Sequence, residues 1–310
     1  MKPKIVLPEA GGPAGLVWPA PAKLNLFLHI TGRREDGYHE LQTLYQFIDV
    51  GDSIDIRLRD DGRIVRRRGA PGVEMMDDLM VRAAMRLQQL AGTRLGAELW
   101  LHKRLPAGAG IGGGSSDAAT TLVALNHLWG TGVDSEALAR LGLSLGADVP
   151  VFVNGQAAWA EGLGERLQTV NPAPGWYLLV LPPCEVSTAS AFAEPELTRN
   201  TPPITISDFF SGQGHNDFEP VVRQRYAQVD QALQWLEQFG RARLSGSGGA
   251  CFVACIDADS ARRASRALPR AMREAGFRAW AVEGLNRSPL LQRLALARQS
   301  GEDVDRSFGV

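Results

Sequence analysis

The sequence predicts an α+β protein with two domains, in which mixed sheets pack against helices. The chain has 310 residues, whereas one domain usually contains roughly 100–200. Apolar residues make up 45% of the chain and charged residues 22%, which is typical of a globular protein with a buried core. Segments with the alternation of a strand also interchange with segments of helical spacing. We place the domain boundary at residues 158–164, giving domains of residues 1–160 and 161–310.

The first strand and turn are expected near the N-terminus. Residues 22–30 alternate between leucine or isoleucine and other residues, as in a half-buried strand, so Lys23 and Asn25 share the face away from the core. Asp36 and Gly37 indicate a turn. Residues 41–58 then predict further strand, interrupted near Gly51 and Asp52.

Helices and strands alternate through the rest of the first half. Asp77 and Asp78 precede a helix that is expected to reach Leu90 and end at Gly92. Residues 97–105 predict a strand and residues 118–128 a buried helix. A short helix is expected from Asp134 to Gly146.

The second half repeats this mixture. We expect strands at residues 177–180, at 251–256 and around Trp280, and a basic helix between the last two. Residues 222–236 have the spacing of one amphipathic helix that stops at Gly240. We expect the leader around residues 11–15 and the tail after Gln299 to be loose.

Composition excludes several classes of protein. The formal net charge of −1 argues against a nucleic-acid partner that would be held by a global positive field. No apolar run approaches the 18 or so residues of a membrane helix, and the N-terminus lacks the apolar region of a secretory signal. Three cysteines without a Cys-x-x-Cys pair indicate neither a disulfide framework nor a zinc site. We expect a cytoplasmic protein, monomeric or weakly homodimeric, without membrane or nucleic-acid partners.

A glycine-rich loop at residues 108–116 lies between a predicted strand and a predicted helix. Glycines let the backbone approach a ligand closely, and the helix N-terminus favours an anion, so phosphate is the natural ligand. The spacing Gly108, Gly110, Gly113 formally satisfies a dinucleotide-binding pattern, but any loop so rich in glycine does. No lysine follows as in a Walker A loop, and protein-kinase motifs are absent from the chain.

Three segments together resemble the motifs of the GHMP kinases. Residues 21–26, 106–116 and 244–250 are similar to the first, second and third motifs of that family, in the family's order. The resemblance implies two α+β domains with the active site in the cleft between them. Residues 37–43 and 146–152 narrow it to members that use ATP to phosphorylate the 2-hydroxyl of a cytidine diphosphate-linked methylerythritol, in the non-mevalonate route to isoprenoid precursors.

The resemblance also implies roles for individual residues. Asp148 would be the catalytic base, with Lys23 as its partner. The substrate would be held by Asn25, Tyr38, His39, Lys103, Thr188 and Phe192. The nucleotide would be held by Leu79, Pro106, Ala107, Gly108, Ala109, Gly110, Ile111, Gly112, Gly113, Gly114, Ser115 and Ser116. Mg²⁺ is expected to accompany ATP, with its protein ligands unassigned except for a possible hydroxyl from Ser115.

The chain departs from several relatives at Asp78 and Asp117, where those carry asparagine. Each aspartate adds a negative charge near the expected polyphosphate, and we expect a slight weakening of nucleotide binding. From the residues alone, Lys23 can equally be an ordinary exposed strand lysine and Asp148 a turn or helix-cap residue. The turn at 244–250 can be structural instead of ligand-binding.

Other functions stay open at this point. The nearest alternative is another small-molecule kinase of the same family, such as a homoserine or mevalonate kinase. More distant alternatives are a dinucleotide-dependent oxidoreductase and a nucleotide-binding module without catalysis.

Overall fold

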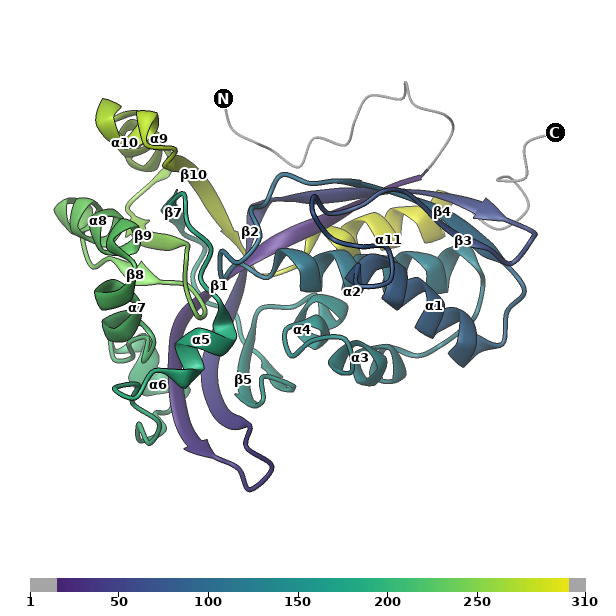
Figure 1. Ribbon diagram of the computed structural model, residues 1–310, viewed down its shortest axis with the longest axis horizontal. Coiled ribbons are helices and arrows are strands. Elements are labelled where there is room, and N and C mark those ends of the chain that lie inside the picture. Colours follow the sequence, from purple (N-terminus) through teal and green to yellow (C-terminus); the bar gives the residue numbers. More distant parts are fainter. Residues whose placement is uncertain (1–15, 301–310) are drawn as a thin grey trace.

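The computed structural model describes residues 16–300 (Figure 1). The expected loose leader at 11–15 lies outside the described residues, as does nearly all of the tail after Gln299. The strands are β1 Leu16–Arg33, β2 His39–Arg59, β3 Ile64–Arg68, β4 Gly96–His102, β5 Ala158–Gly162, β6 Arg166–Thr169, β7 Trp176–Leu181, β8 Arg243–Leu244, β9 Cys251–Cys255 and β10 Arg278–Leu285. The helices are α1 Leu79–Ala91, α2 Gly113–Leu128, α3 Ser135–Leu143, α4 Val149–Asn154, α5 Thr188–Ala193, α6 Ile206–Phe210, α7 Glu219–Arg225, α8 Ala227–Leu236, α9 Ala258–Arg266, α10 Arg270–Glu274 and α11 Pro289–Ser300.

Strand β2 organises the sheet. Along one edge it pairs antiparallel with β1, and along the other it pairs in turn with β5, β10 and β4. From β10 the sheet continues through β7 and β9 to β8. β1 and β2 therefore run from one half of the molecule into the other (Figure 1), and a site carried on them has a common rigid support.

Helices cover the two halves separately. Helices α1 to α4 and α11 gather on one side of the molecule and α7 to α10 on the other (Figure 1). One apolar cluster joins α1, α2 and α4 to β2 and β4, and a second joins α7, α8 and α9 to β7 and β9. A third cluster lies between them, around Leu24, Ile48 and Leu179. The predicted mixture of helices and sheet in two halves is confirmed.

The first strand and the turn after it are confirmed, but the strand is not half-buried as expected. β1 is covered on both faces, so Lys23 and Asn25 are each only 2% exposed. A lysine can be buried only when its charge is paired or hydrogen-bonded. The alternating pattern in the sequence predicted the strand correctly. It could not show that the glycine loop covers the second face of that strand.

The predicted interruption of the second strand is also wrong. Gly51 lies within β2 opposite Pro21, next to a register shift in β1 between Pro21 and Lys23. A Cβ at Gly51 would lie 2.3 Å from the carbonyl oxygen of Ala20. Glycine is required here because another backbone approaches closely, and not because the strand ends.

Most predicted helices are confirmed, with several differences. Asp78 caps α1, Gly92 ends it in a left-handed conformation, and Asp134 caps α3. The predicted single helix over 222–236 is wrong, because the chain is extended at Tyr226 (φ −121°, ψ 92°) between α7 and α8. Both helices bury their apolar side in the same cluster, so the apolar spacing persists across the break. Helices α4, α5, α6 and α11 were not predicted, and the predicted basic helix is divided into α9 and α10.

The proposed domain division remains a prediction. Strand β5 lies in the boundary segment and pairs with β2. Helix α11, which follows the boundary in sequence, contributes Leu290 and Ala297 to the apolar cluster of the first half.

The close approach at Gly51 predicts a clear effect on stability. We expect Gly51→Ala to lower the free energy of unfolding by about 1–3 kcal/mol, because backbone atoms must move to admit the methyl group. Urea denaturation measures this change. Gly32→Ala in β1 is the matched control, since the nearest atom to its Cβ would be Glu40 Oε2 at 3.8 Å. Equal stability of the two variants would contradict this explanation.

Candidate active site

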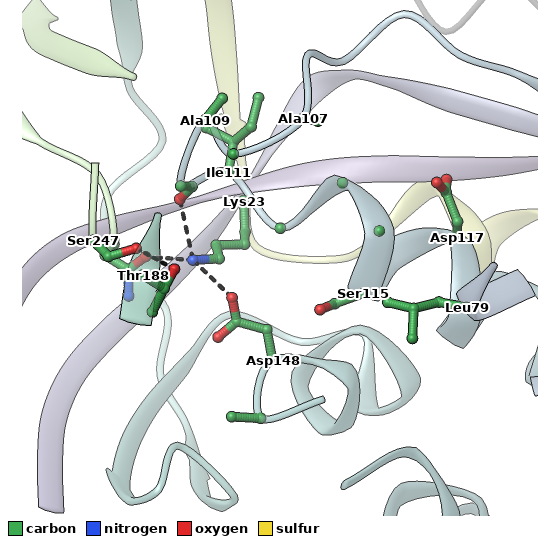
Figure 2. Close-up of a pocket in the computed structure, with 18 of the residues that line it drawn as sticks. Lys23, Leu79, Ala107, Ala109, Ile111, Ser115, Asp117, Asp148, Thr188 and Ser247 are labelled. Carbon is green, nitrogen blue, oxygen red and sulfur yellow. Dashed lines mark hydrogen bonds and ion pairs between the residues drawn. The ribbon is translucent and has the colours of Figure 1, made fainter. Parts of the chain in front are cut away.

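A cavity of about 560 Å³ lies at the junction of the two halves (Figure 2). The first half contributes β1, the glycine loop and the N-terminal ends of α1 and α2. The second half contributes Thr188, Phe192, Phe218 and the turn at Gly246 and Ser247. Its volume is within the usual range for small-molecule sites.

Lys23 is the centre of the polar contacts in this cavity. Its Nζ lies 3.1 Å from Asp148 Oδ2, donates to Asn25 Oδ1 at 2.5 Å and donates to the carbonyl oxygen of Gly110 at 3.3 Å. In Figure 2, a dashed line joins the ammonium group of Lys23 to the carboxylate of Asp148. The two residues expected to form the catalytic pair are therefore in contact, although 125 residues separate them in the sequence.

Asp148 is held by a residue that the sequence reasoning missed. It lies at the N-terminal end of α4, and the hydroxyl of Tyr45 donates to its Oδ1 at 2.9 Å. Burial raises the pKa of Tyr45 well above 10, and the charge of Asp148 adds to this, so the hydroxyl keeps its proton. No sequence motif marks Tyr45. Its place in the site follows from its pairing with Asn25 across β1 and β2.

The glycine loop is packed tightly under the third motif. Gly110 has φ +71°, and a Cβ there would lie 2.2 Å from the carbonyl oxygen of Ser245, so only glycine fits. Gly112, also with positive φ, is the N-cap residue that precedes helix α2. The loop thus brings backbone N–H groups and the N-terminus of a 16-residue helix to the cavity, an arrangement that favours anions.

The turn at 244–250 is bonded to both other motifs. Ser245 accepts from the backbone N–H of Asn25 at 3.2 Å and donates to the carbonyl oxygen of Gly110 at 3.0 Å. Asn216, which the sequence reasoning also missed, donates to the carbonyl oxygens of Leu244 and Gly246, each at 2.9 Å. These hydrogen bonds give the turn a structural role. Two of its residues, Gly246 and Ser247, also line the cavity.

Most residues expected to bind ligands line this cavity. Leu79 and residues 106–115 do so, whereas Ser116 is fully buried beneath them. Asn25, Lys103, Thr188 and Phe192 line it as well, and Thr188 contacts Ser247 at 2.7 Å.

Tyr38 and His39 are placed differently from the other expected substrate residues. Neither is among the residues that line the cavity. Tyr38 is 64% exposed, and the ring of His39 stacks on Phe192 with 4.6 Å between centroids. Burial lowers the pKa of His39, and Arg199 and Arg33 lower it further. His39 thus contacts Phe192, which lines the cavity, without lining the cavity itself. Contact of Tyr38 or His39 with substrate stays a prediction.

The two unusual aspartates are both paired with cations. Asp78 contacts Arg66 at 3.1 Å and caps α1, and Asp117 contacts Lys103 at 2.8 Å. Burial raises the pKa of Asp117 to about 7, although Lys103 opposes this shift. Each of these two carboxyl groups therefore has a cationic partner, and the slight weakening of nucleotide binding stays a prediction.

Comparisons with known proteins agree with this geometry. Residues 78–156 match the model of the GHMP kinases N terminal domain, and residues 205–274 match GHMP kinases C terminal. A 4-diphosphocytidyl-2-C-methyl-D-erythritol kinase from Halorhodospira halophila is 56% identical over 92% of this chain and 98% of its own length. The chain belongs to the 4-diphosphocytidyl-2-C-methyl-D-erythritol kinase family. It is a small-molecule kinase of the GHMP superfamily, which implies that it uses ATP.

Other relatives support the same assignment. The kinase of the same name from Thiobacillus denitrificans is 54% identical over 88% of this chain and 96% of its own length. A crystal structure of 4-(cytidine 5'-diphospho)-2C-methyl-D-erythritol kinase aligns with a TM-score of 0.74 and 35% identity, covering 87% of this chain and 99% of that one. A homoserine kinase from Cytophaga hutchinsonii shares the fold, with a TM-score of 0.66 over 91% of this chain and 98% of its own, but is only 18% identical. The identities favour the predicted kinase over the alternative ones.

The contact between Tyr45 and Asp148 predicts a kinetic effect. We expect Tyr45→Phe to lower kcat by about tenfold, because a hydrogen bond to a charged group is lost where Asp148 must be held in place. Tyr177→Phe is the matched control, since its buried hydroxyl donates to Gln46 at 2.6 Å outside the cavity. Steady-state kinetics of both variants decide the matter, and equal kcat values would refute a role for Tyr45.

Proposed function

We propose that this kinase transfers the γ-phosphoryl group of ATP to the 2-hydroxyl of 4-diphosphocytidyl-2-C-methyl-D-erythritol, giving the 2-phosphate and ADP in the non-mevalonate route to isoprenoid precursors. The observation that carries the mechanism is the 3.1 Å contact between Lys23 and Asp148 at the mouth of the glycine loop. The names of the relatives supply the substrate.

Asp148 is the proposed base of the reaction. Its carboxylate takes the proton of the substrate hydroxyl as the oxygen attacks the γ-phosphorus and the bond to the β-phosphate oxygen breaks. Lys23 is the proposed electrostatic partner, because its buried ammonium orients the carboxylate and stabilises negative charge that develops on the attacking oxygen. The bonds from Lys23 to Asn25 and Gly110 hold the ammonium in place before the substrate arrives.

The nucleotide is proposed to lie along the glycine loop, with its phosphates against the first turn of α2 and its base towards Leu79. Mg²⁺ prefers oxygen ligands and commonly binds through phosphates, water and one or two protein oxygens. Within residues 16–300 no group of three or more His, Cys, Asp or Glu side chains could hold a metal ion. The described residues therefore suit an ion that is held mainly by the phosphates of the nucleotide. The hydroxyl of Ser115, in α2, is a proposed protein ligand. Bound there, Mg²⁺ would neutralise charge on the phosphoryl oxygens.

The other end of the cavity is proposed to hold the cytidine and methylerythritol groups. Asn25, Thr188 and Phe192 line this end, and the stack of His39 on Phe192 offers an aromatic edge beside it. Stacking of a base on an aromatic ring contributes roughly 1–3 kcal/mol. Tyr38 and His39 are the proposed contacts for the cytosine ring. Lys103, which the resemblance assigns to the substrate, is a proposed ligand contact as well.

The halves divided near residue 160 are proposed as N- and C-terminal domains, with the N-terminal one carrying the nucleotide loop. A monomer or weak homodimer is proposed. No helix within residues 16–300 is long and apolar enough to span a membrane. We propose a cytoplasmic location, where ATP is available, and no nucleic-acid partner.

The role of Asp148 predicts a loss of turnover without a loss of ATP binding. We expect Asp148→Asn to lower kcat by about 10²- to 10⁴-fold, the usual contribution of a general base, while the Kd for ADP measured by calorimetry changes little. Asp134→Asn is the control, because asparagine also caps a helix and Asp134 does not line the cavity. Unchanged turnover in Asp148→Asn would eliminate the assignment.

The substrate assignment is tested by a parallel assay of ADP release. We expect turnover with 4-diphosphocytidyl-2-C-methyl-D-erythritol and none with mevalonate or homoserine, in the presence of ATP and Mg²⁺. Turnover only with another alcohol would keep the kinase and exclude the proposed substrate. ATP binding without turnover on any of the three would favour a module without catalysis.

A further inference from the structure

The side chain of Asp52 accepts three hydrogen bonds from the residues that lead into the glycine loop. Asp52 lies in β2, and its side chain is fully buried. Oδ1 accepts from the backbone N–H groups of Arg104 and Leu105, at 2.5 and 2.9 Å, and Oδ2 accepts from Lys103 Nζ at 2.7 Å. One carboxylate therefore fixes three consecutive residues that lead into the loop.

Lys103 connects Asp52 to the other end of the loop. Its Nζ also donates to Asp117 Oδ2, in the second turn of α2, at 2.8 Å. A Cβ at Gly113 would lie only 3.1 Å from the same nitrogen, so the ammonium lies against the first residue of α2. Two of its three hydrogens are used by carboxylates, and the residue lines the cavity.

The charge of Lys103 is maintained by these two neighbours. Burial alone would favour the neutral amine, but Asp117 and Asp52 outweigh it and raise the pKa of Lys103. A permanent cation therefore lies at the N-terminal turn of α2, where an anion is already favoured. In Figure 2, Asp117 lies beyond Ser115, at the end of the view away from Thr188.

We propose that Asp52, which does not touch the cavity, is a positioning residue for nucleotide binding: it holds Lys103 so that the third hydrogen of the ammonium is available to a phosphate oxygen of the nucleotide. This inference rests on the proposed function, since it assumes that ATP occupies the glycine loop. It also places Lys103 on the nucleotide side of the cavity. The bonds to Arg104 and Leu105 keep the loop entrance fixed while Lys103 engages the ligand.

The decisive variant is Asp52→Asn. Its amide oxygen can still accept the two backbone N–H groups, whereas its NH₂ group would face the ammonium of Lys103, donor against donor. We expect the Kd for ADP, measured by calorimetry, and the KM for ATP to rise about tenfold or more, the loss of one hydrogen bond to a charged group. The Kd for adenosine, the KM for the alcohol substrate and kcat at saturating ATP should stay within about threefold.

Two further variants separate positioning from mere stabilisation. Asp55→Asn is the matched control on the same strand, because Asp55 contacts His102 at 2.7 Å and not the loop, and we expect wild-type Kd values. Lys103→Met should weaken ADP to a similar degree as Asp52→Asn, and adding Asp52→Asn to it should change the Kd by less than about twofold. That non-additivity is the signature of one residue acting through another.

The outcomes are distinguishable from failure of the proposed function. A wild-type protein that binds no ADP would refute ATP binding itself. A wild type that binds ADP, beside an Asp52→Asn variant that melts at lower temperature with the same Kd, would overturn the positioning role. Unchanged ADP affinity in Lys103→Met would overturn it too, even if Asp52→Asn could not be purified in folded form.

Discussion

The buried ammonium group of Lys23 is the constraint on which the site depends. A charge removed from water must be compensated, and its partners come from three separate places: Asn25 on the same strand, Gly110 in the glycine loop and Asp148 at the start of α4. These segments can satisfy the lysine only when the sheet, the loop and the helix are all assembled. Folding and assembly of the active site are therefore one event.

The rest of the architecture keeps this assembly rigid. β1 and β2 pass through both halves, so Lys23, Asn25, Tyr45 and Asp52 belong to one antiparallel pair of strands. The third motif closes over the glycine loop through Ser245, and Asn216 fixes that motif in turn. Preorganised dipoles and charges of this kind are what phosphoryl transfer requires, because the reaction depends mainly on positioning and on stabilising charge.

Two lysine ammonium groups, those of Lys23 and Lys103, line the cavity. Lys23 lies where the hydroxyl is proposed to react, and Lys103 lies against α2 where the phosphates are proposed to bind. Lys23 has one carboxylate partner, Asp148, which is partly exposed. Lys103 has two, Asp52 and Asp117, and the side chain of Asp52 is inaccessible. The same pair of residue types is thus proposed to have a chemical role at Lys23 and Asp148 and a positioning role at Lys103 and Asp52.

The sequence by itself determined the fold class, the family and the position of the glycine-rich loop. Glycine spacing, helix caps at Asp78 and Asp134, and three motifs in order are local properties, and local properties can be read from a single chain. They were sufficient for the α+β fold, the family and most residues of the cavity. The burial of Lys23, the continuity of β2 at Gly51 and the break at Tyr226 depend on what packs against each segment, so they could not be read locally. The same holds for Tyr45, Asp52, Ser245 and Asn216. Their roles arise from hydrogen bonds to residues far away in the sequence, and only the tertiary structure decides which distant groups meet.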